Sequence, residues 1–287
     1  MTETLEIVSR LCTASRKHYD NPYEAIEWPE SLDERDWFFS PELISLYGTE
    51  YYEGLTETQR RRLSFWETIN FFSLNIHGEK PLVEGLARRL YRNSPAEVDS
   101  YLHHFLDEEN KHMVYFGGFC RRYAGKVYPD KKVAFARTYA EGEEDFLFFA
   151  KVLVFEEIVD TYNLKMAVDT RLPALVRTIN RLHHEDETRH LGFGRRQTRE
   201  IFDRYRPRWN EGTRRGIQEY LRDYLTATWR EYYNPRVYED AELPGDPFEI
   251  MQMALRHPAT RARERQIAQR CVSYLTRNGM ITEERAA

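Results

Sequence analysis

The chain has 287 residues, of which 41% are hydrophobic and 31% charged, and its formal net charge is −5. This length and composition fit a globular protein that buries a full hydrophobic interior. A mildly acidic chain gives no reason to expect nucleic acid or an anionic membrane as a partner. Its three cysteines are widely spaced, which excludes a disulfide framework or zinc ribbon and suits a reducing cytoplasm.

No targeting or membrane segment is predicted. The N-terminal residues MTETLEIVSRLC lack the basic start and apolar run of a signal peptide. The most apolar stretch, residues 146–155, is too short to span a bilayer and contains Lys151. We therefore expect a cytoplasmic protein that does not enter membranes.

The N-terminal part is predicted to form a cover segment over residues 1–54. Residues 19–54 are rich in Pro, Tyr and Trp, which favours irregular structure with short helices. One of these helices is expected to start at Ser40-Pro41, because proline suits the first helical position.

A long helix is predicted to begin at Thr56, where Thr56 and Gln59 form the pattern of a capping box. Its helical apolar spacing continues to about Arg92. A kink is expected at residues 78–81, because proline inside a helix removes a hydrogen bond and clashes with the preceding turn.

The second long helix has a clear start signal. Ser94 offers an N-cap, Pro95 suits the first helical position, and Glu97 completes a capping box. We expect this helix to continue to about Gly125, a plausible C-cap.

Long apolar periodicity continues through the rest of the chain, without alternating strand patterns. Helices are predicted over 140–169, from Pro173 to Tyr205 and over 211–232, before two shorter helices that close at Asn278-Gly279. These elements predict an all-α single domain over 1–287. A four-helix bundle over 55–206 forms its core, and additional helices follow over 207–287.

Two Glu-x-x-His tetrads fall at the centres of the second and fourth predicted core helices, at Glu109–His112 and Glu187–His190. A bundle that donates two such tetrads and a Glu from each of two other helices builds a site for two metal ions, usually iron. Two tetrads alone are little more than chance gives in a Glu-rich chain. Their positions in the bundle are therefore decisive.

The heights of four glutamates along the bundle agree. Glu79 lies 15 residues before the turn near Ser94 and Glu109 lies 15 residues after it, so both are roughly 22 Å from that turn. Glu156 and Glu187 lie about equally far from the next turn. Because paired helices are antiparallel, each pair is predicted to meet at one level.

These four glutamates also lie on apolar helix faces. Glu109, for example, shares its face with Phe105 and Phe116. Ionised carboxylates on apolar faces are costly unless they bind something positive. Two divalent metal ions would neutralise the four charges, so the pattern predicts a two-metal centre.

Other glutamates are weaker candidates. Glu67 shares the first helix but would lie roughly 18 Å away from the common level. Glu84 falls on an outward face among Lys80 and Arg88. Glu157 stays open as an alternative to Glu156, because one residue changes the height little.

A third histidine shares the face of the second tetrad. His183 lies four residues before Glu187 and seven before His190, so we predict that it is a further metal ligand. Its neighbour His184 is the open alternative.

Carboxylates next to the tetrads are expected to support the histidines. Metal-bound histidines commonly donate their second ring N–H to a carboxylate, which fixes the tautomer and the ring orientation. We therefore expect Asp186 to hold His112 and Glu108 to hold His190 across the bundle.

The chain resembles a known family at Glu108-Glu109-x-x-His112 and Asp186-Glu187-Thr188-Arg189-His190. These motifs are similar to those of the ferritin-like di-iron carboxylate superfamily. The additional His183 narrows the resemblance to the arylamine N-oxygenases of antibiotic biosynthesis, the p-aminobenzoate and chloramphenicol-precursor N-oxygenase family. The resemblance covers about residues 40–240.

The resemblance implies an assignment of ligands and a reaction. One iron would take Glu79, Glu109 and His112, and the other would take Glu156, Glu187, His190 and His183, so these seven are the expected metal-binding and catalytic residues. The cofactors would be two Fe ions and O₂, with manganese as an alternative metal. In that family a peroxo-diferric species oxygenates an amine to a hydroxylamine, nitroso or nitro product in a biosynthetic pathway.

The expected partners follow from what the sequence lacks. No Gly-rich nucleotide fingerprint is present, so electrons would come from an external ferredoxin or reductase. The substrate would be a small amine or aromatic molecule, and a homodimer is typical of the relatives. Phe116 replaces the tyrosine of radical-generating relatives, so no stable tyrosyl radical is expected.

Three alternatives stay open at this point. The same centre could hydroxylate, desaturate or cleave at carbon instead of nitrogen. It could also serve a ferritin-like ferroxidase that handles iron. Finally, the tetrads could be unrelated pairs in an ordinary helical scaffold.

Overall fold

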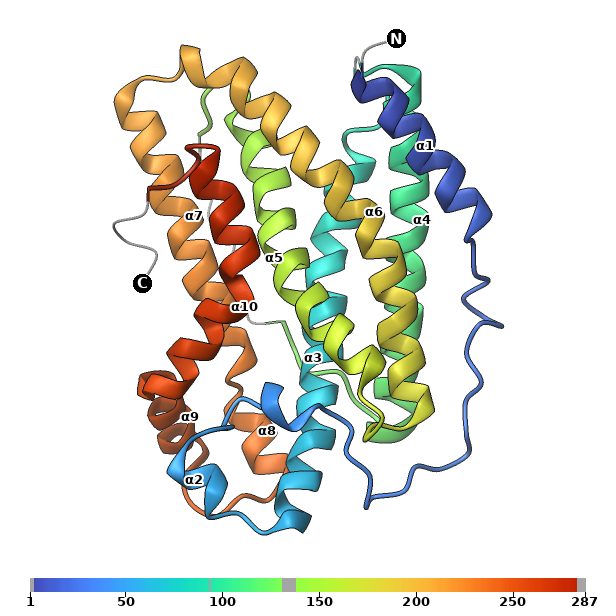
Figure 1. Cartoon of the computed structure of the whole chain (residues 1–287), viewed down its shortest axis with the longest axis vertical. Helices are drawn as coiled ribbons and strands as arrows, with labels where there is room; N and C mark the ends of the chain where they lie inside the picture. The colour runs from blue at the N-terminus through green and yellow to red at the C-terminus, as the bar shows by residue number, and fades with distance from the viewer. Residues whose placement is uncertain (1–2, 93, 131–137, 283–287) are drawn as a thin grey trace.

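The computed structural model describes residues 3–92, 94–130 and 138–282 of the chain. Helices dominate these residues, and no strand occurs among them. Four long helices form a bundle (Figure 1). They are α3 (Glu57–Ala87), α4 (Ala96–Phe119), α5 (Glu143–Val168) and α6 (Ala174–Tyr205). The predicted all-α four-helix bundle with additional helices is confirmed.

The start of α3 follows its sequence signal. The Thr56 side chain accepts from the backbone N–H of Gln59, and the Gln59 side chain accepts from the backbone N–H of Thr56. The helix continues through Pro81 and ends at Ala87, five residues before the predicted end at Arg92.

The predicted cap of α4 is wrong by one residue. Pro95 is the N-cap, and the Ser94 hydroxyl instead donates to the carboxylate of Asp99 at 2.9 Å. The other end agrees with prediction, because a π-helical turn over Cys120–Ala124 ends at Gly125, whose φ is 67°.

The second hairpin joins α5 and α6 through a short turn that ends at Pro173, as predicted. It leads through a 3-10 turn (Arg206–Arg208) into α7 (Glu211–Tyr232), which is capped by Asn210 and packs against α5 and α3. The α7 helix therefore covers one side of the four-helix core.

Further helices lie outside the core. The α1 helix (Glu3–Lys17), which the sequence analysis did not predict, packs along α4 and α6 (Figure 1). The cover segment contributes a 3-10 helix (Pro41–Leu43), as predicted, and α2 (Glu50–Glu53). After α7 come α8 (Pro235–Asp240), which was not predicted, α9 (Pro247–Arg256) and α10 (Pro258–Arg277).

Small residues let two core helices approach closely. A Cβ atom at Gly78 would lie 2.2 Å from the Phe155 ring, and one at Gly85 would lie 2.0 Å from the Phe148 ring. These contacts join α3 to α5 on both sides of Glu79. A side chain at either glycine would push the two helices apart, and with them Glu79 and Glu156.

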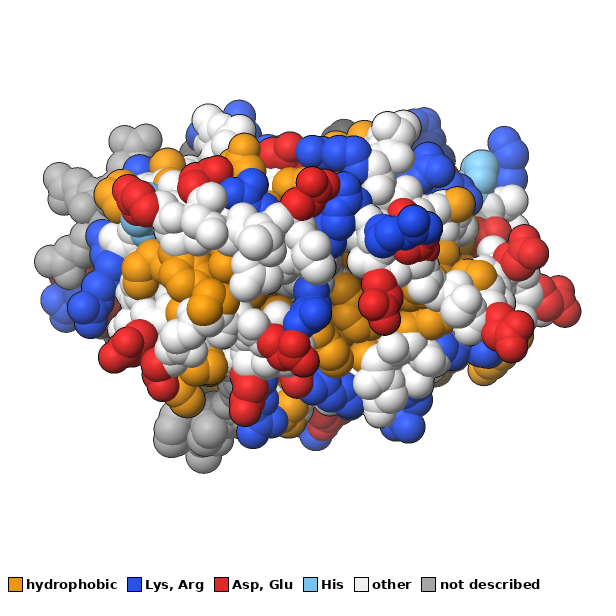
Figure 2. Space-filling model, turned by 90° about the horizontal axis from the view of Figure 1, so that it is seen from below, with side chains coloured by type: hydrophobic (Ala, Val, Ile, Leu, Met, Phe, Trp, Pro, Cys, Tyr) orange, Lys and Arg blue, Asp and Glu red, His pale blue; other side chains and the backbone are white. Residues whose placement is uncertain are grey.

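The outside of the protein is mixed in character. Figure 2 shows one face on which acidic and basic side chains alternate and hydrophobic ones gather in patches between them. Among the described residues, no helix is long and apolar enough to cross a membrane. The three cysteines, Cys12, Cys120 and Cys271, are buried and free.

Candidate metal centre

Four glutamates from four helices meet inside the bundle. Glu79 of α3, Glu109 of α4, Glu156 of α5 and Glu187 of α6 are each at most 1% exposed. Their oxygens and the neighbouring histidine nitrogens fall into three groups whose atoms lie within 4.8 Å of one another. The structure thus brings together the four carboxylates selected by height and face.

Glu109 lies between two of the histidines. Its Oε2 is 3.4 Å from Nδ1 of His112, and its Oε1 is 2.9 Å from Nδ1 of His190. Glu187 is placed similarly, because its Oε1 lies 3.7 Å from Nδ1 of His112 and 2.9 Å from Nδ1 of His190. Each of these carboxylates therefore lies beside both tetrad histidines.

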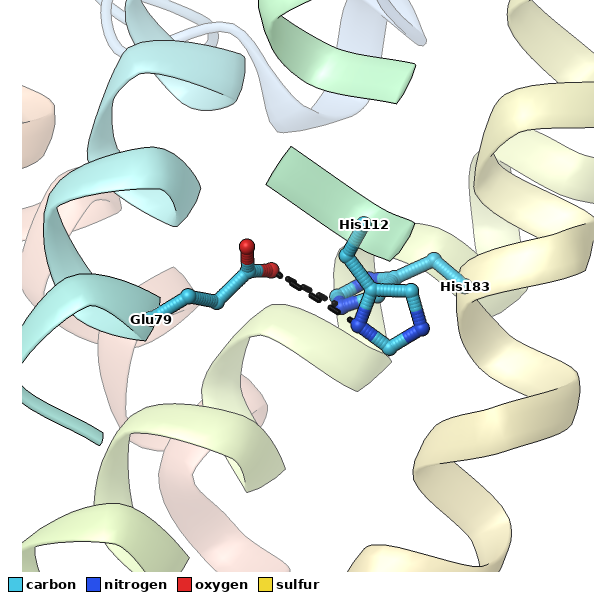
Figure 3. A group of neighbouring side chains, drawn as sticks. All are labelled: Glu79, His112 and His183. Carbon is cyan, nitrogen blue, oxygen red and sulfur yellow. Dashed lines mark ion pairs between the residues drawn. The ribbon is translucent and has the colours of Figure 1, made fainter. Parts of the chain in front are cut away.

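His183 joins the same group. Its Nε2 lies 3.5 Å from Oε1 of Glu79, and its ring meets that of His112 edge to face (Figure 3). The same Nε2 lies 3.3 Å from Oε1 of Glu187. His184 points away from the group and pairs with Asp160. The structure therefore places His183, and not His184, beside the glutamates.

The remaining alternatives lie elsewhere. Glu157 is buried but pairs with Arg195 of α6, at 2.7 Å. Glu84 is exposed and pairs with Arg88 on its own helix. Glu67 is bound to the cover segment at Ser45. Neither Glu157, Glu84 nor Glu67 belongs to the three groups of close donors.

Several of the central donor atoms have no hydrogen-bond partner. These atoms are both carboxylate oxygens of Glu79, both of Glu156, Oε2 of Glu187 and Nε2 of His183. Buried polar atoms are normally satisfied, and unpaired ones cost free energy. Carboxylate oxygens and imidazole nitrogens suit iron and manganese, so these residues fit a pair of such ions.

The pKa values show how charge is arranged without metal ions. Burial raises the pKa of Glu79 to about 7, and burial with neighbouring carboxylates raises the pKa of Glu156 well above its usual range. Burial lowers the pKa of His112, but hydrogen bonds to Asp186 and Glu109 outweigh it and raise the value to about 10. Protons on histidine thus supply positive charge here, and metal ions must displace them on binding.

The outer nitrogens of two histidines face carboxylates. Nε2 of His112 lies 3.0 Å from Oδ2 of Asp186, and Nε2 of His190 lies 2.7 Å from Oε2 of Glu108. This crosswise pairing confirms the supporting contacts predicted from the sequence. It leaves Nδ1 of both rings directed at the glutamates.

Two buried cations complete this outer layer, and the sequence analysis missed both. Nζ of Lys111 lies 2.6 Å from Asp186, and Nη2 of Arg189 lies 2.6 Å from Glu108. They balance the two outer carboxylates, so the four inner ones are left for the ions. The sequence does contain a signal for both, because each basic residue directly precedes the histidine of a tetrad.

A third missed residue is Asn163. It lies on α5, seven residues after Glu156 and therefore on the same helix face. Its fully buried side chain contacts Nδ1 of His183.

Comparisons with known proteins identify the family of this chain. A family model described as P-aminobenzoate N-oxygenase AurF matches residues 1–279. A search of curated proteins finds no match.

The chain is similar to two solved structures of one oxidase. An R2-like ligand-binding oxidase variant with aerobically reconstituted Mn/Fe cofactor is 16% identical, with a TM-score of 0.50, over 96% of this chain and 94% of that one. Another variant of that oxidase, with the same kind of cofactor, is 15% identical over 96% and 93%, with a TM-score of 0.49. At such identity the first likeness shows the fold, and it confirms the ferritin-like bundle.

Proposed function

The chain belongs to the p-aminobenzoate N-oxygenase AurF family, and from this premise we propose that it oxygenates the nitrogen of a small amine with O₂. It is an enzyme, an oxidoreductase, and its cofactor is a pair of iron ions. Two irons held close together supply the electrons that O₂ activation needs.

The observation that carries this proposal is the group of unpartnered, fully buried donors in the centre of the bundle. Four carboxylates balance the charge of two divalent ions, and Lys111 and Arg189 already neutralise the outer pair. In the described chain the positive charge beside Glu79 and Glu156 comes from protonated histidines of the same group, and metal ions would take the place of those protons. Manganese suits the same donors, and the solved oxidase carries Mn/Fe.

We assign the ligand roles from the distances. Glu109 and Glu187 would each bind metal beside two of the histidines. Glu79 of α3 and Glu156 of α5 would supply the other two carboxylates. His112 and His190 would bind through Nδ1. His183 would bind through Nε2, which lies between Glu79 and Glu187.

The α7 helix offers a wall for an aromatic substrate. Tyr224, Thr228 and Tyr232 repeat every four residues and so share one face. Tyr232 is buried, its hydroxyl has no partner, and the nearby Glu156 carboxylate adds to the effect of burial in raising its pKa. We place the substrate ring in the pocket lined by Phe155 of α5 and by Thr228 and Tyr232 of α7, with the Tyr232 hydroxyl as a contact for a polar substituent.

Several finer expectations stay predictions. They are the peroxo-diferric intermediate, the biosynthetic role, the external electron donor, the homodimer and the cytoplasmic location.

The test is a product analysis. The protein would be loaded with ferrous iron and supplied with a chemical reductant, ¹⁸O₂ and a panel of arylamines. We expect about two irons per chain and labelled hydroxylamine, nitroso or nitro products, identified by mass spectrometry against standards. Labelled aminophenols would instead indicate attack on carbon, and a chain that binds no iron would contradict the proposal. His190→Ala is the matched inactive control.

A further inference from the structure

The three histidines of the centre differ in what holds their outer nitrogens. His112 and His190 face the carboxylates of Asp186 and Glu108. The outer nitrogen of His183, Nδ1, faces the neutral side-chain amide of Asn163. The side chains of His183 and Asn163 are fully buried, so water does not take this place.

The hydrogen bonds of this pair are incomplete in one specific way. The amide nitrogen Nδ2 of Asn163 lies against Nδ1 of His183, while Oδ1 of Asn163 has no partner. In that orientation Nδ1 must accept, so the ring proton sits on Nε2, the atom directed at the glutamates. A nitrogen that carries a proton cannot bind a metal ion.

A half-turn of the amide removes both problems. The two orientations of an asparagine side chain fill nearly the same space. With Oδ1 against the ring, Nδ1–H donates to it, the orphaned oxygen gains a partner, and Nε2 keeps a free lone pair toward Glu79 and Glu187.

We propose that Asn163 is the positioning residue that makes His183 a metal ligand, an inference that rests on the proposed two-metal centre. Its Oδ1 accepts the Nδ1–H of His183 in the metal-loaded protein and so fixes the tautomer in which Nε2 binds.

A neutral acceptor also makes His183 a different kind of ligand. An N–H that donates to a carboxylate makes its imidazole a stronger base, as for His112 and His190. An amide oxygen polarises the ring less, so His183 should be the weakest of the three imidazole ligands. It should therefore be lost first when its support is removed.

The test uses the full chain, stripped of metal and titrated without oxygen with Co²⁺, whose visible absorption changes with the number and geometry of its ligands. We expect Asn163→Leu to weaken binding of one of the two ions roughly 10- to 100-fold. Its spectrum should match that of His183→Ala. Asn163→Asp retains an acceptor, so it should keep the wild-type ligand number.

A matched control separates support of His183 from loss of a buried amide. Asn75 of α3 is equally buried, its Nδ2 donates only to the carbonyl of Phe71 in its own helix, and its Oδ1 is also unpartnered. Asn75→Leu should destabilise the metal-free fold about as much as Asn163→Leu but leave Co²⁺ affinity and spectrum unchanged.

A double variant decides the mechanism. Once His183→Ala has removed the ligand, Asn163→Leu should weaken Co²⁺ binding no further, because coupled residues are not additive. Additive losses, or a wild-type spectrum in Asn163→Leu, would overturn the inference while leaving the proposed centre intact. A wild-type chain that binds no Co²⁺ or iron would overturn both.

Discussion

Two glutamates on one helix have the same burial and different surroundings. Glu67 and Glu79 both lie on α3 and are 4% and 0% exposed, and burial raises the pKa of each to about 7. Oε1 of Glu67 accepts from the backbone N–H and the hydroxyl of Ser45. Neither oxygen of Glu79 has a hydrogen-bond partner, and Oε1 lies 3.8 Å from Nδ1 of His112 and 3.5 Å from Nε2 of His183.

The comparison separates a structural carboxyl group from a ligand. Ser45 belongs to the cover segment, and its hydroxyl also contacts the Tyr238 hydroxyl of α8, at 2.9 Å. Glu67 therefore ties two outer segments to the core and uses its hydrogen-bonding capacity for that purpose. Burial and a raised pKa are common to both glutamates. The difference that identifies Glu79 as a metal ligand is that its carboxylate oxygens accept no hydrogen bond.

The largest difference between the two glutamates should appear when each is substituted in turn. Glu79→Ala removes a ligand, so we expect iron content to fall well below two per chain and oxygenase activity to fall to background. Glu67→Gln should keep both ions and most activity. Metal analysis and product formation measure this. Equal metal loss in both variants would break the distinction.

Metal loading should stabilise the fold through the metal centre. It should not depend on the hydrogen bonds from Ser45 to Glu67, which we call the clamp. Ligand that binds only the folded state at 1,000 times its Kd adds about 4 kcal/mol to the free energy of unfolding. We expect a large rise in Tm on loading with ferrous iron, reversed by a chelator. Glu67→Gln should show the full rise and Glu79→Ala little of it. A full rise in Glu79→Ala would place the ions elsewhere.

Removing the clamp should reduce stability without touching the metal. Glu67→Ala leaves the backbone N–H and hydroxyl of Ser45 without their acceptor, at a cost of about 1–3 kcal/mol. Urea unfolding of metal-free protein measures the loss, and metal content should be unchanged. If Glu67→Ala loses iron as well as stability, the clamp at Glu67 and the metal ligand Glu79 are not independent.

The clamp should also give stability a pH dependence. Burial raises the pKa of Glu67 from 4.5 in the unfolded chain to about 7 in the folded chain. Between these values the folded state binds more protons than the unfolded state, so stability falls as pH rises. The contribution is on the order of 1 kcal/mol per pH unit. Glu67→Gln should flatten the metal-free stability curve between pH 5 and 7 by that amount, and an identical curve would contradict the assignment.

Helix lengths and turns explain how far the sequence could go. The rise per residue is fixed, and Pro95 and Pro173 mark the turns, so the levels of Glu79, Glu109 and Glu187 follow from counting. The choice between Glu156 and Glu157 does not follow from counting. Adjacent residues point about 100° apart around a helix, so one of the two joins the central group and the other pairs with Arg195 of α6. That choice depends on how helices pack.

The cations were missed for a similar reason. Lys111 and Arg189 look like residues of solvated helix faces when the sequence is considered one helix at a time. In the folded chain they lie between α4 and α6, on which α1 packs, and they are 2% and 7% exposed. Because α1 was not predicted, the burial of this side could not be predicted either.

The smallest effect is expected from substituting Glu84, a further glutamate of α3. Glu84 is exposed, and its pair with Arg88 is an (i, i+4) contact on one helix, which contributes about 0.5 kcal/mol or less. Glu84→Ala should therefore leave metal content, activity and Tm close to wild type. Since Glu79 lies only five residues away, this variant tests whether loss of metal requires a substitution on the face of α3 that points into the bundle. A loss of iron in Glu84→Ala would mean that any change in this part of α3 disturbs the centre, and Glu79→Ala would then no longer identify a ligand.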